Sequence, residues 1–144
     1  MVLPQLFAMI AAIGGMHLLL RDWLLSMILG ASIYLAYSFG SRYILAAAHR
    51  AGIRLSRHGR FKEAIACYEQ SYDFFSRYHW IDRYRSVVLM TPSAISYREM
   101  ALINIAFCHG QLGNGDAAKQ YYEKALDEFP DSVMARAGLG MVNA

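Results

Sequence analysis

Apolar residues are concentrated at the start of the chain, where two long runs, 2–20 and 23–39, are separated only by Arg21 and Asp22. The first 40 residues contain no other Lys, Arg, Asp or Glu, and the other 23 of the chain's 25 such residues follow them. This distribution predicts two domains, which are a membrane anchor over residues 1–40 and a domain of soluble character over residues 41–144.

The two apolar runs predict a helical hairpin in the membrane. A helix needs about 20 apolar residues to cross roughly 30 Å of hydrocarbon, and these runs of 19 and 17 residues lie near the short limit. A single helix through both runs would place Arg21 and Asp22 in lipid, at about 2.5–3.5 kcal/mol each. A tight turn at an interface avoids this cost, allows Asp22 to cap the second helix and places Trp23 where interfacial aromatic residues are common. We therefore predict two transmembrane helices.

Basic residues predict the orientation of this anchor. Six of them occur between residues 41 and 62 with no acidic residue before Glu63, whereas the turn offers one Arg. Basic residues favour the cytoplasmic side, so we expect a multi-pass protein with its N-terminus and its soluble domain in the cytoplasm. The same side chains could also contact anionic lipid. These membrane-proximal residues are Arg42, Arg50, Arg54, Arg57, Arg60 and Lys62.

Small residues recur four positions apart inside the apolar runs, as in Ala11 with Gly15 and Ser26 with Gly30. Such faces allow helices in a membrane to approach closely. We expect the two predicted spans to pack on each other through these residues. Packing against another membrane protein, or against a second copy of this chain, is the alternative.

An internal repeat is present in residues 41–144. Residues 59–71 align with residues 113–125, and each segment has a Gly followed by small, aromatic and small residues 5, 9 and 12 positions later. These spacings place the three side chains on one face of a helix. They are Ala64, Tyr68 and Ser71 in the first copy, and Ala118, Tyr122 and Ala125 in the second.

This spacing resembles the tetratricopeptide repeat, a 34-residue helix–turn–helix unit. In the second copy, Leu102, Ile105, Ala106 and His109 stand at positions of the first helix, and Ala118, Tyr122 and Pro130 at later positions. The resemblance implies a short all-α solenoid. Together with the hairpin predicted from the apolar runs, it gives an all-α fold in which a transmembrane helical hairpin precedes this solenoid. The implied units cover about residues 45–78 and 99–132, with a partial third unit over 133–144.

Helix-capping residues agree with these limits. Ser96 and Glu99 form a capping box for a helix over residues 97–112, and Ser132 can cap a helix after Pro130. The distance from Ala64 to Ala118 exceeds one repeat by 20 residues, which places an insertion around residues 77–95.

Aromatic and cationic residues crowd the segment 74–85 at the start of this insertion. Three interpretations remain open for it. The segment could bind nucleic acid by stacking and charge, lie on a membrane interface, or be a helix, either long or broken once near residues 78–80, that covers the repeat helices.

Catalytic and metal-binding patterns are absent from the sequence, so we expect no enzyme activity, no catalytic residue, no cofactor and no metal. Cys67 and Cys108 lie in amphipathic helices, where cysteines are more often core thiols than nucleophiles. The five histidines lack the spacing of metal ligands. We expect no nucleic-acid partner, because the basic character comes largely from residues 42–62 beside the anchor.

The resemblance also implies a concave groove, lined by the first helix of each unit, for a protein or peptide partner. Of the residues with which the family grips a C-terminal carboxylate, only Asn104 is matched. The groove is mostly apolar and suits an amphipathic helix or an apolar peptide, unless the protein's own tail or residues 79–95 fill it. The implied groove residues are His49, Ile53, Ser56, Arg57, Met100, Ile103, Asn104, Phe107 and Gln111.

Two functions follow from these expectations. The first is a membrane-anchored interaction module, an adaptor or assembly scaffold that presents this groove at the cytoplasmic face. The second is a structural or self-assembling subunit of a membrane complex, held together by the small-residue faces of the spans and by the C-terminal helix.

Overall fold

The chain divides into two compact units in the computed structural model. One unit contains residues 1–46 and 83–94, and the other contains residues 47–82 and 95–144. The structure describes residues 3–89, 93 and 95–143, with side chains for all of these except 3–5, 42, 86 and 87. Every regular element in this described part is an α-helix, which confirms the all-α prediction. Residues 83–94, from the predicted insertion, are grouped with the N-terminal helices.

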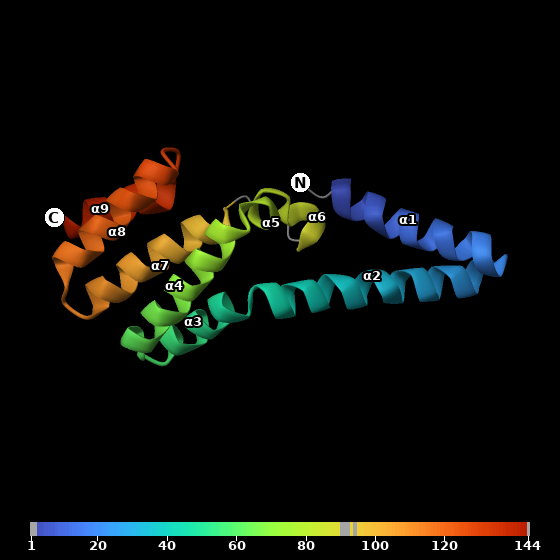
Figure 1. Ribbon diagram of the computed structural model, residues 1–144, viewed down its shortest axis with the longest axis horizontal. Helices are drawn as coiled ribbons and strands as arrows, with labels where there is room; N and C mark the ends of the chain where they lie inside the picture. The colour runs from blue at the N-terminus through green and yellow to red at the C-terminus, as the bar shows by residue number, and fades with distance from the viewer. Residues whose placement is uncertain (1–2, 90–92, 94, 144) are drawn as a thin grey trace. The chain divides into compact units, whose positions relative to one another are not determined.

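In the first unit, helix α1 (Leu3–Leu20) folds back on α2 (Trp23–Leu45) through a two-residue turn (Figure 1). Arg21 takes a left-handed backbone conformation, with φ 53°, although it is not a glycine. Its N–H donates to the carbonyl of His17 at 2.9 Å and so closes the end of α1. The Asp22 carboxylate accepts the N–H of Leu25 at 3.0 Å, as predicted for the cap of α2.

Close approach of α1 and α2 depends on Gly30. A Cβ atom at this position would lie 2.7 Å from the Cα of Ile13, so no larger residue fits without moving the helices apart. Ser26, one turn earlier, is also buried. Ala11 and Gly15, in contrast, are exposed, and a Cβ at Gly15 would meet no heavy atom within 4 Å.

Only one of the two predicted spans meets the length and composition of a membrane-crossing helix among the described residues. This helix is α2, while the apolar stretch Leu6–Leu20 of α1 is shorter. Only 17% of the apolar window of α2 is buried, unlike the core helix of a soluble protein. A signal sequence near the N-terminus would share these properties. The structure therefore supports one candidate transmembrane helix, and it does not support the prediction of two.

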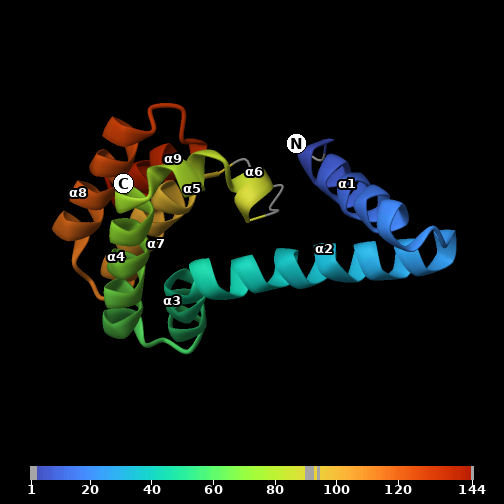
Figure 2. The same ribbon diagram turned by 45° about the vertical axis from the view of Figure 1, so that its right-hand side comes forward.

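The second unit consists of helices that pack in chain order, α3 on α4, α4 on α7, α7 on α8 and α8 on α9 (Figures 1 and 2). Two short helices, α5 and α6, follow α4 in the chain, and α6 belongs to the first unit. The bounds are α3 (Ala47–Arg57), α4 (Phe61–Arg77), α5 (His79–Arg83), α6 (Arg85–Val88), α7 (Tyr97–Gln111), α8 (Gly115–Glu128) and α9 (Val133–Val142). The helix α4 therefore ends near Tyr78, where a break was predicted. A second break follows at Tyr84, so the prediction of a single break was wrong.

The aligned repeat segments adopt the same local structure. Gly59 and Gly113 both have a positive φ, 72° and 76°, which L side chains rarely adopt. The small and aromatic residues that follow them are buried in both copies. Those residues are Ala64, Tyr68 and Ser71 in α4, and Ala118, Tyr122 and Ala125 in α8. The predicted common face is therefore confirmed.

Side-chain caps begin three helices of the second unit. The Ser96 hydroxyl accepts the N–H of Glu99 at 3.0 Å, and Ser132 does the same for the N–H of Ala135 at 3.2 Å. The side chain of Asn114 caps α8 in the same way. Since the predicted caps at Ser96 and Ser132 are both present, the sequence located the starts of α7 and α9.

Candidate protein-interaction surface

Helix α7 has one face in the core and one face in solvent. All of its buried residues except Ala101 belong to two hydrophobic clusters, one shared with α8 and α9 and the other with α3 and α4. Phe107 lies on the opposite face and keeps 45% of its surface exposed. The Phe61 ring holds it edge-on, with centroids 6.3 Å apart and an interplanar angle of 78°. The Phe107 ring therefore has an aromatic neighbour and is also open to solvent.

The predicted groove residues divide into three groups by exposure. His49 and Ile103 are buried, so they are core residues and not surface residues. Arg57, Phe107 and Gln111 are exposed. The remaining four are half-buried, and they are Ile53, Ser56, Met100 and Asn104. Solvent can thus reach all the predicted groove residues except the first two.

His49 illustrates why a core position was mistaken for a groove position. Its ring packs edge-on against the rings of Tyr68 and Tyr97, at centroid distances of 5.4 and 5.3 Å. Its Nδ1 lies 3.3 Å from the hydroxyl oxygen of Ser71. Burial lowers the pKa of His49 to about 4, so the imidazole is neutral near pH 7. It offers no positive charge to a partner.

The two cysteines lie within helices of the second unit. Cys108 is buried and its thiol donates to the hydroxyl of Ser56, with the sulfur and oxygen 3.9 Å apart. Burial raises the pKa of Cys108, which keeps the thiol protonated and weakens it as a nucleophile. Cys67 is half-buried. Among the described residues, no three His, Cys, Asp or Glu side chains gather into a metal-binding group.

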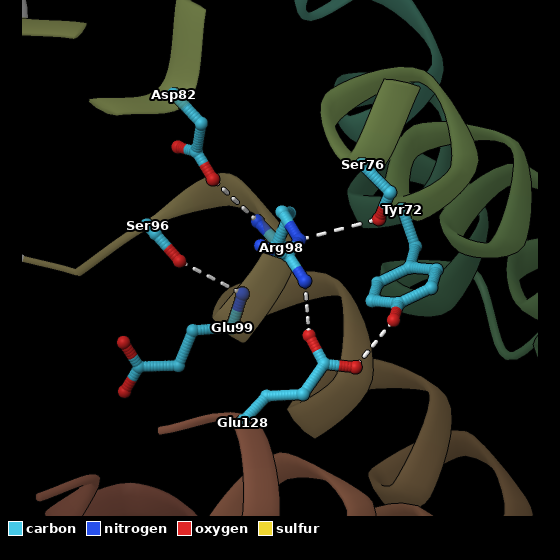
Figure 3. A network of polar contacts seen from close by, with 7 residues as sticks. All are labelled: Tyr72, Ser76, Asp82, Ser96, Arg98, Glu99 and Glu128. Carbon is cyan, nitrogen blue, oxygen red and sulfur yellow. Dashed lines mark hydrogen bonds and ion pairs between the residues drawn. The ribbon is translucent and has the colours of Figure 1, made fainter. Parts of the chain in front are cut away.

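Asp82, a residue of the predicted insertion, caps the N-terminus of α7 (Figure 3). Its buried carboxylate accepts the N–H of Tyr97 at 2.8 Å and the N–H of Arg98 at 3.2 Å. Ser96 accepts the next N–H, that of Glu99. The first three N–H groups of α7, which a helix cannot satisfy internally, therefore all have acceptors.

Arg98 extends this network to α4 and α8 (Figure 3). Its guanidinium donates to the hydroxyl of Ser76 at 3.2 Å and forms an ion pair with Glu128. Glu128 also accepts the hydroxyl of Tyr72. The guanidinium lies 5.8 Å from the ring centroid of Tyr72 and 5.6 Å from that of Phe129. Three helices are joined at the end of α7 that carries these residues.

The basic residues predicted to lie near the membrane are exposed wherever their side chains are described. These are Arg50, Arg54, Arg57, Arg60 and Lys62. The side chain of Arg42 lies outside the described residues. Arg60 forms an ion pair with Glu63. A hollow of about 260 Å³ lies at the end of α3, and it is lined by Arg54, Leu55, His58 and Arg60.

Comparison with protein families adds one finding to this geometry. Residues 100–132 match the tetratricopeptide repeat. This part of the chain is a tetratricopeptide repeat motif. It runs from α7 through α8 to the cap of α9, and it agrees with the expected unit 99–132. No curated protein and no solved structure matches the chain.

A tetratricopeptide repeat motif in the C-terminal half suggests interaction with another protein. The exposed face of α7 lies within the matched residues. Sequence reasoning located this face through the repeat spacing, but it missed Asp82, because a carboxylate 15 residues before the helix it caps leaves no periodic pattern.

Proposed function

We propose that the protein is a non-catalytic, membrane-anchored interaction module. In this proposal α2 is the anchor and α1 packs along it. The repeat helices face the cytoplasm, because the basic residues follow the C-terminal end of α2 and favour that side. The protein would act as an adaptor or assembly scaffold, holding a protein or peptide partner near the membrane.

The observation that carries the proposal is the half-exposed Phe107 within the tetratricopeptide repeat motif. Aromatic residues supply much of the binding energy at protein interfaces. Phe107 contacts the Phe61 ring and still exposes much of its surface. Half-buried Asn104 and Met100 precede Phe107 by about one and two turns of α7, respectively. Such a surface suits the apolar side of an amphipathic helix or an apolar peptide.

Replacing Phe107 by Glu tests this surface. We expect the substitution to weaken partner capture by roughly 30-fold or more, since a central aromatic residue of an interface is typically worth about 2 kcal/mol or more. The tagged full-length protein would be purified in mild detergent from its native membranes, and co-purifying proteins would be quantified by mass spectrometry.

Gln120→Glu is the matched control, because it adds the same charge at an exposed position of α8. It should leave capture unchanged. The protein must remain in the membrane fraction in both variants. Undiminished capture of the same partner by the Phe107 variant would reject this surface as the binding site.

A self-assembling subunit is the second candidate function, and a specific observation favours it. Helix α9 exposes apolar side chains, with Val133 75% exposed and Met141 78% exposed. Ala11 and Gly15 form a second exposed small-residue surface on α1. Either surface could pack against another copy of the chain.

Gly15→Leu and Gly30→Leu separate assembly from hairpin formation. Gly15 has open space around it, so a Leu there should disrupt packing between copies and leave the hairpin intact. Gly30→Leu should instead force α1 and α2 apart, because its Cβ would overlap Ile13. Native mass measurements in mild detergent would show the oligomer. An oligomer unaffected by Gly15→Leu would exclude assembly through this face.

A further inference from the structure

Helix α6 and its flanking residues contact the N-terminal helices within the first unit. The Tyr37 hydroxyl of α2 donates to the carbonyl of Val88 at 3.2 Å, and α6 also contacts α1. Leu89 follows α6 and is fully buried. Figure 1 shows α6 beside the N-terminal end of α1. Part of the predicted insertion is therefore packed against the proposed anchor.

The contact with Tyr37 fixes the depth of this segment along α2. Tyr37 follows Trp23 by 14 residues, which is about 21 Å of helix at a rise of about 1.5 Å per residue. If Trp23 marks one interface, a hydrocarbon layer of roughly 30 Å ends about 9 Å beyond Tyr37. Segments that lie in an interface bury their apolar side about 5–10 Å into this boundary. The depth of Val88 falls within that range.

The side chains around α6 are also of the kinds that occur at a membrane interface. Tyr84 is 57% exposed, and Arg83 beside it is exposed as well. No acidic residue occurs from 83 to 89, whereas Arg83 and Arg85 are cationic. Tyrosine is enriched at membrane interfaces, and each Arg near an anionic leaflet contributes about 1 kcal/mol of attraction.

We propose that residues 83–89 form an interfacial segment at the boundary between the lipid headgroups and the acyl chains, near the C-terminal end of α2. The exposed residues of the segment, Arg83 and Tyr84, face anionic lipid in this proposal. The contact with α2 and the absence of acidic residues in the segment favour lipid over a protein partner. This inference rests on the proposed function, because it requires α2 to be the anchor. It gives the insertion a role in attachment to the membrane.

Fluorescence quenching by brominated lipid tests the proposal on the full chain. The protein carries Trp80→Phe, which leaves Trp23 alone, and is reconstituted in vesicles of phosphatidylcholine and phosphatidylserine with bromine high on the acyl chains. Tyr84→Trp then adds a reporter at the proposed segment. Phe107→Trp, in the same background, adds a reporter on the proposed protein-binding surface.

We expect the reporter at position 84 to lose most of its emission to brominated lipid and to resist quenching by aqueous acrylamide. The reporter at position 107 should behave in the opposite way. If Trp23 is quenched while the reporter at position 84 responds only to acrylamide, the interfacial segment is disproved and the anchor stands.

Two further outcomes concern the proposed function. A Trp23 that bromine does not quench would remove the anchor, and with it both proposals. Quenching of both added reporters by brominated lipid would support the interfacial segment. It would also place Phe107 against lipid, and so would overturn the protein-binding surface.

Discussion

Phe75→Ala is expected to lower the free energy of unfolding of the second unit by about 3–5 kcal/mol, the usual cost of deleting a buried aromatic ring. The Phe75 side chain is fully buried. Its ring stacks on Tyr97 with centroids 4.6 Å apart and an interplanar angle of 12°, and Phe74 packs edge-on against it. Truncation would remove these contacts and leave a cavity between α4 and α7. Denaturant unfolding of the full chain in a membrane mimetic, followed by circular dichroism, would measure the loss.

Phe74→Ala is the matched control for this prediction. Phe74 is the same residue type at the neighbouring position, but it is only half-buried. We expect its free energy of unfolding to fall by about 1 kcal/mol, which is near the centre of the distribution of stability changes for point mutations. Equal losses for the two variants would mean that Phe75 does not occupy the core between α4 and α7.

Asp82→Ala is expected to lower the free energy of unfolding of the second unit by about 2–3 kcal/mol, because it leaves two N–H groups at the start of α7 without their acceptor. The start of α7 should open more readily than the rest of the unit. Hydrogen exchange at the amides of Tyr97 and Arg98 should accelerate more than exchange in the middle of α7. Asp82→Asn keeps one carbonyl oxygen as an acceptor, so it should recover part of the stability.

Asp73→Ala serves as a control, since Asp73 is an exposed acidic residue of α4. It removes the same charge without removing a cap. If it lowered stability as much as Asp82→Ala, net charge and not helix capping would account for the effect.

Much of the second unit follows from the sequence because its determinants are local. The spacing of Gly59, Ala64 and Tyr68 repeats at Gly113, Ala118 and Tyr122, and it predicts both the turn and the buried face. The cap at Ser96 requires only a hydroxyl three residues before Glu99. Such features depend on neighbouring residues, so a single sequence contains them.

Features that depend on contacts between distant residues were harder to predict. His49 has the spacing of a groove residue, but Tyr97, from a different helix, covers it. Asp82 caps a helix that begins 15 residues later. The grouping of residues 83–94 with α1 and α2 depends on contacts such as that between Tyr37 and Val88, 51 residues apart. No periodic pattern marks any of these pairs.

The turn at Arg21 and Asp22 was correctly placed, although it contains no Gly or Pro. Arg21 adopts the left-handed conformation at a cost of about 1–2 kcal/mol. The charges that made a continuous helix unfavourable located the turn, and the Asp22 cap helps to offset its strain.

The caps of α7 also bear on the order in which the protein is made. Chains emerge from the ribosome N-terminus first, at about 5–20 residues per second. Asp82 and Ser96 both precede the residues whose backbone N–H groups they accept. The N–H groups of the first turn of α7 therefore have acceptors as soon as the helix forms. Glu128, the ion-pair partner of Arg98, follows it by 30 residues. We therefore expect α7 to dock on α4 before α8 has left the ribosome, with the Arg98–Glu128 pair forming afterwards.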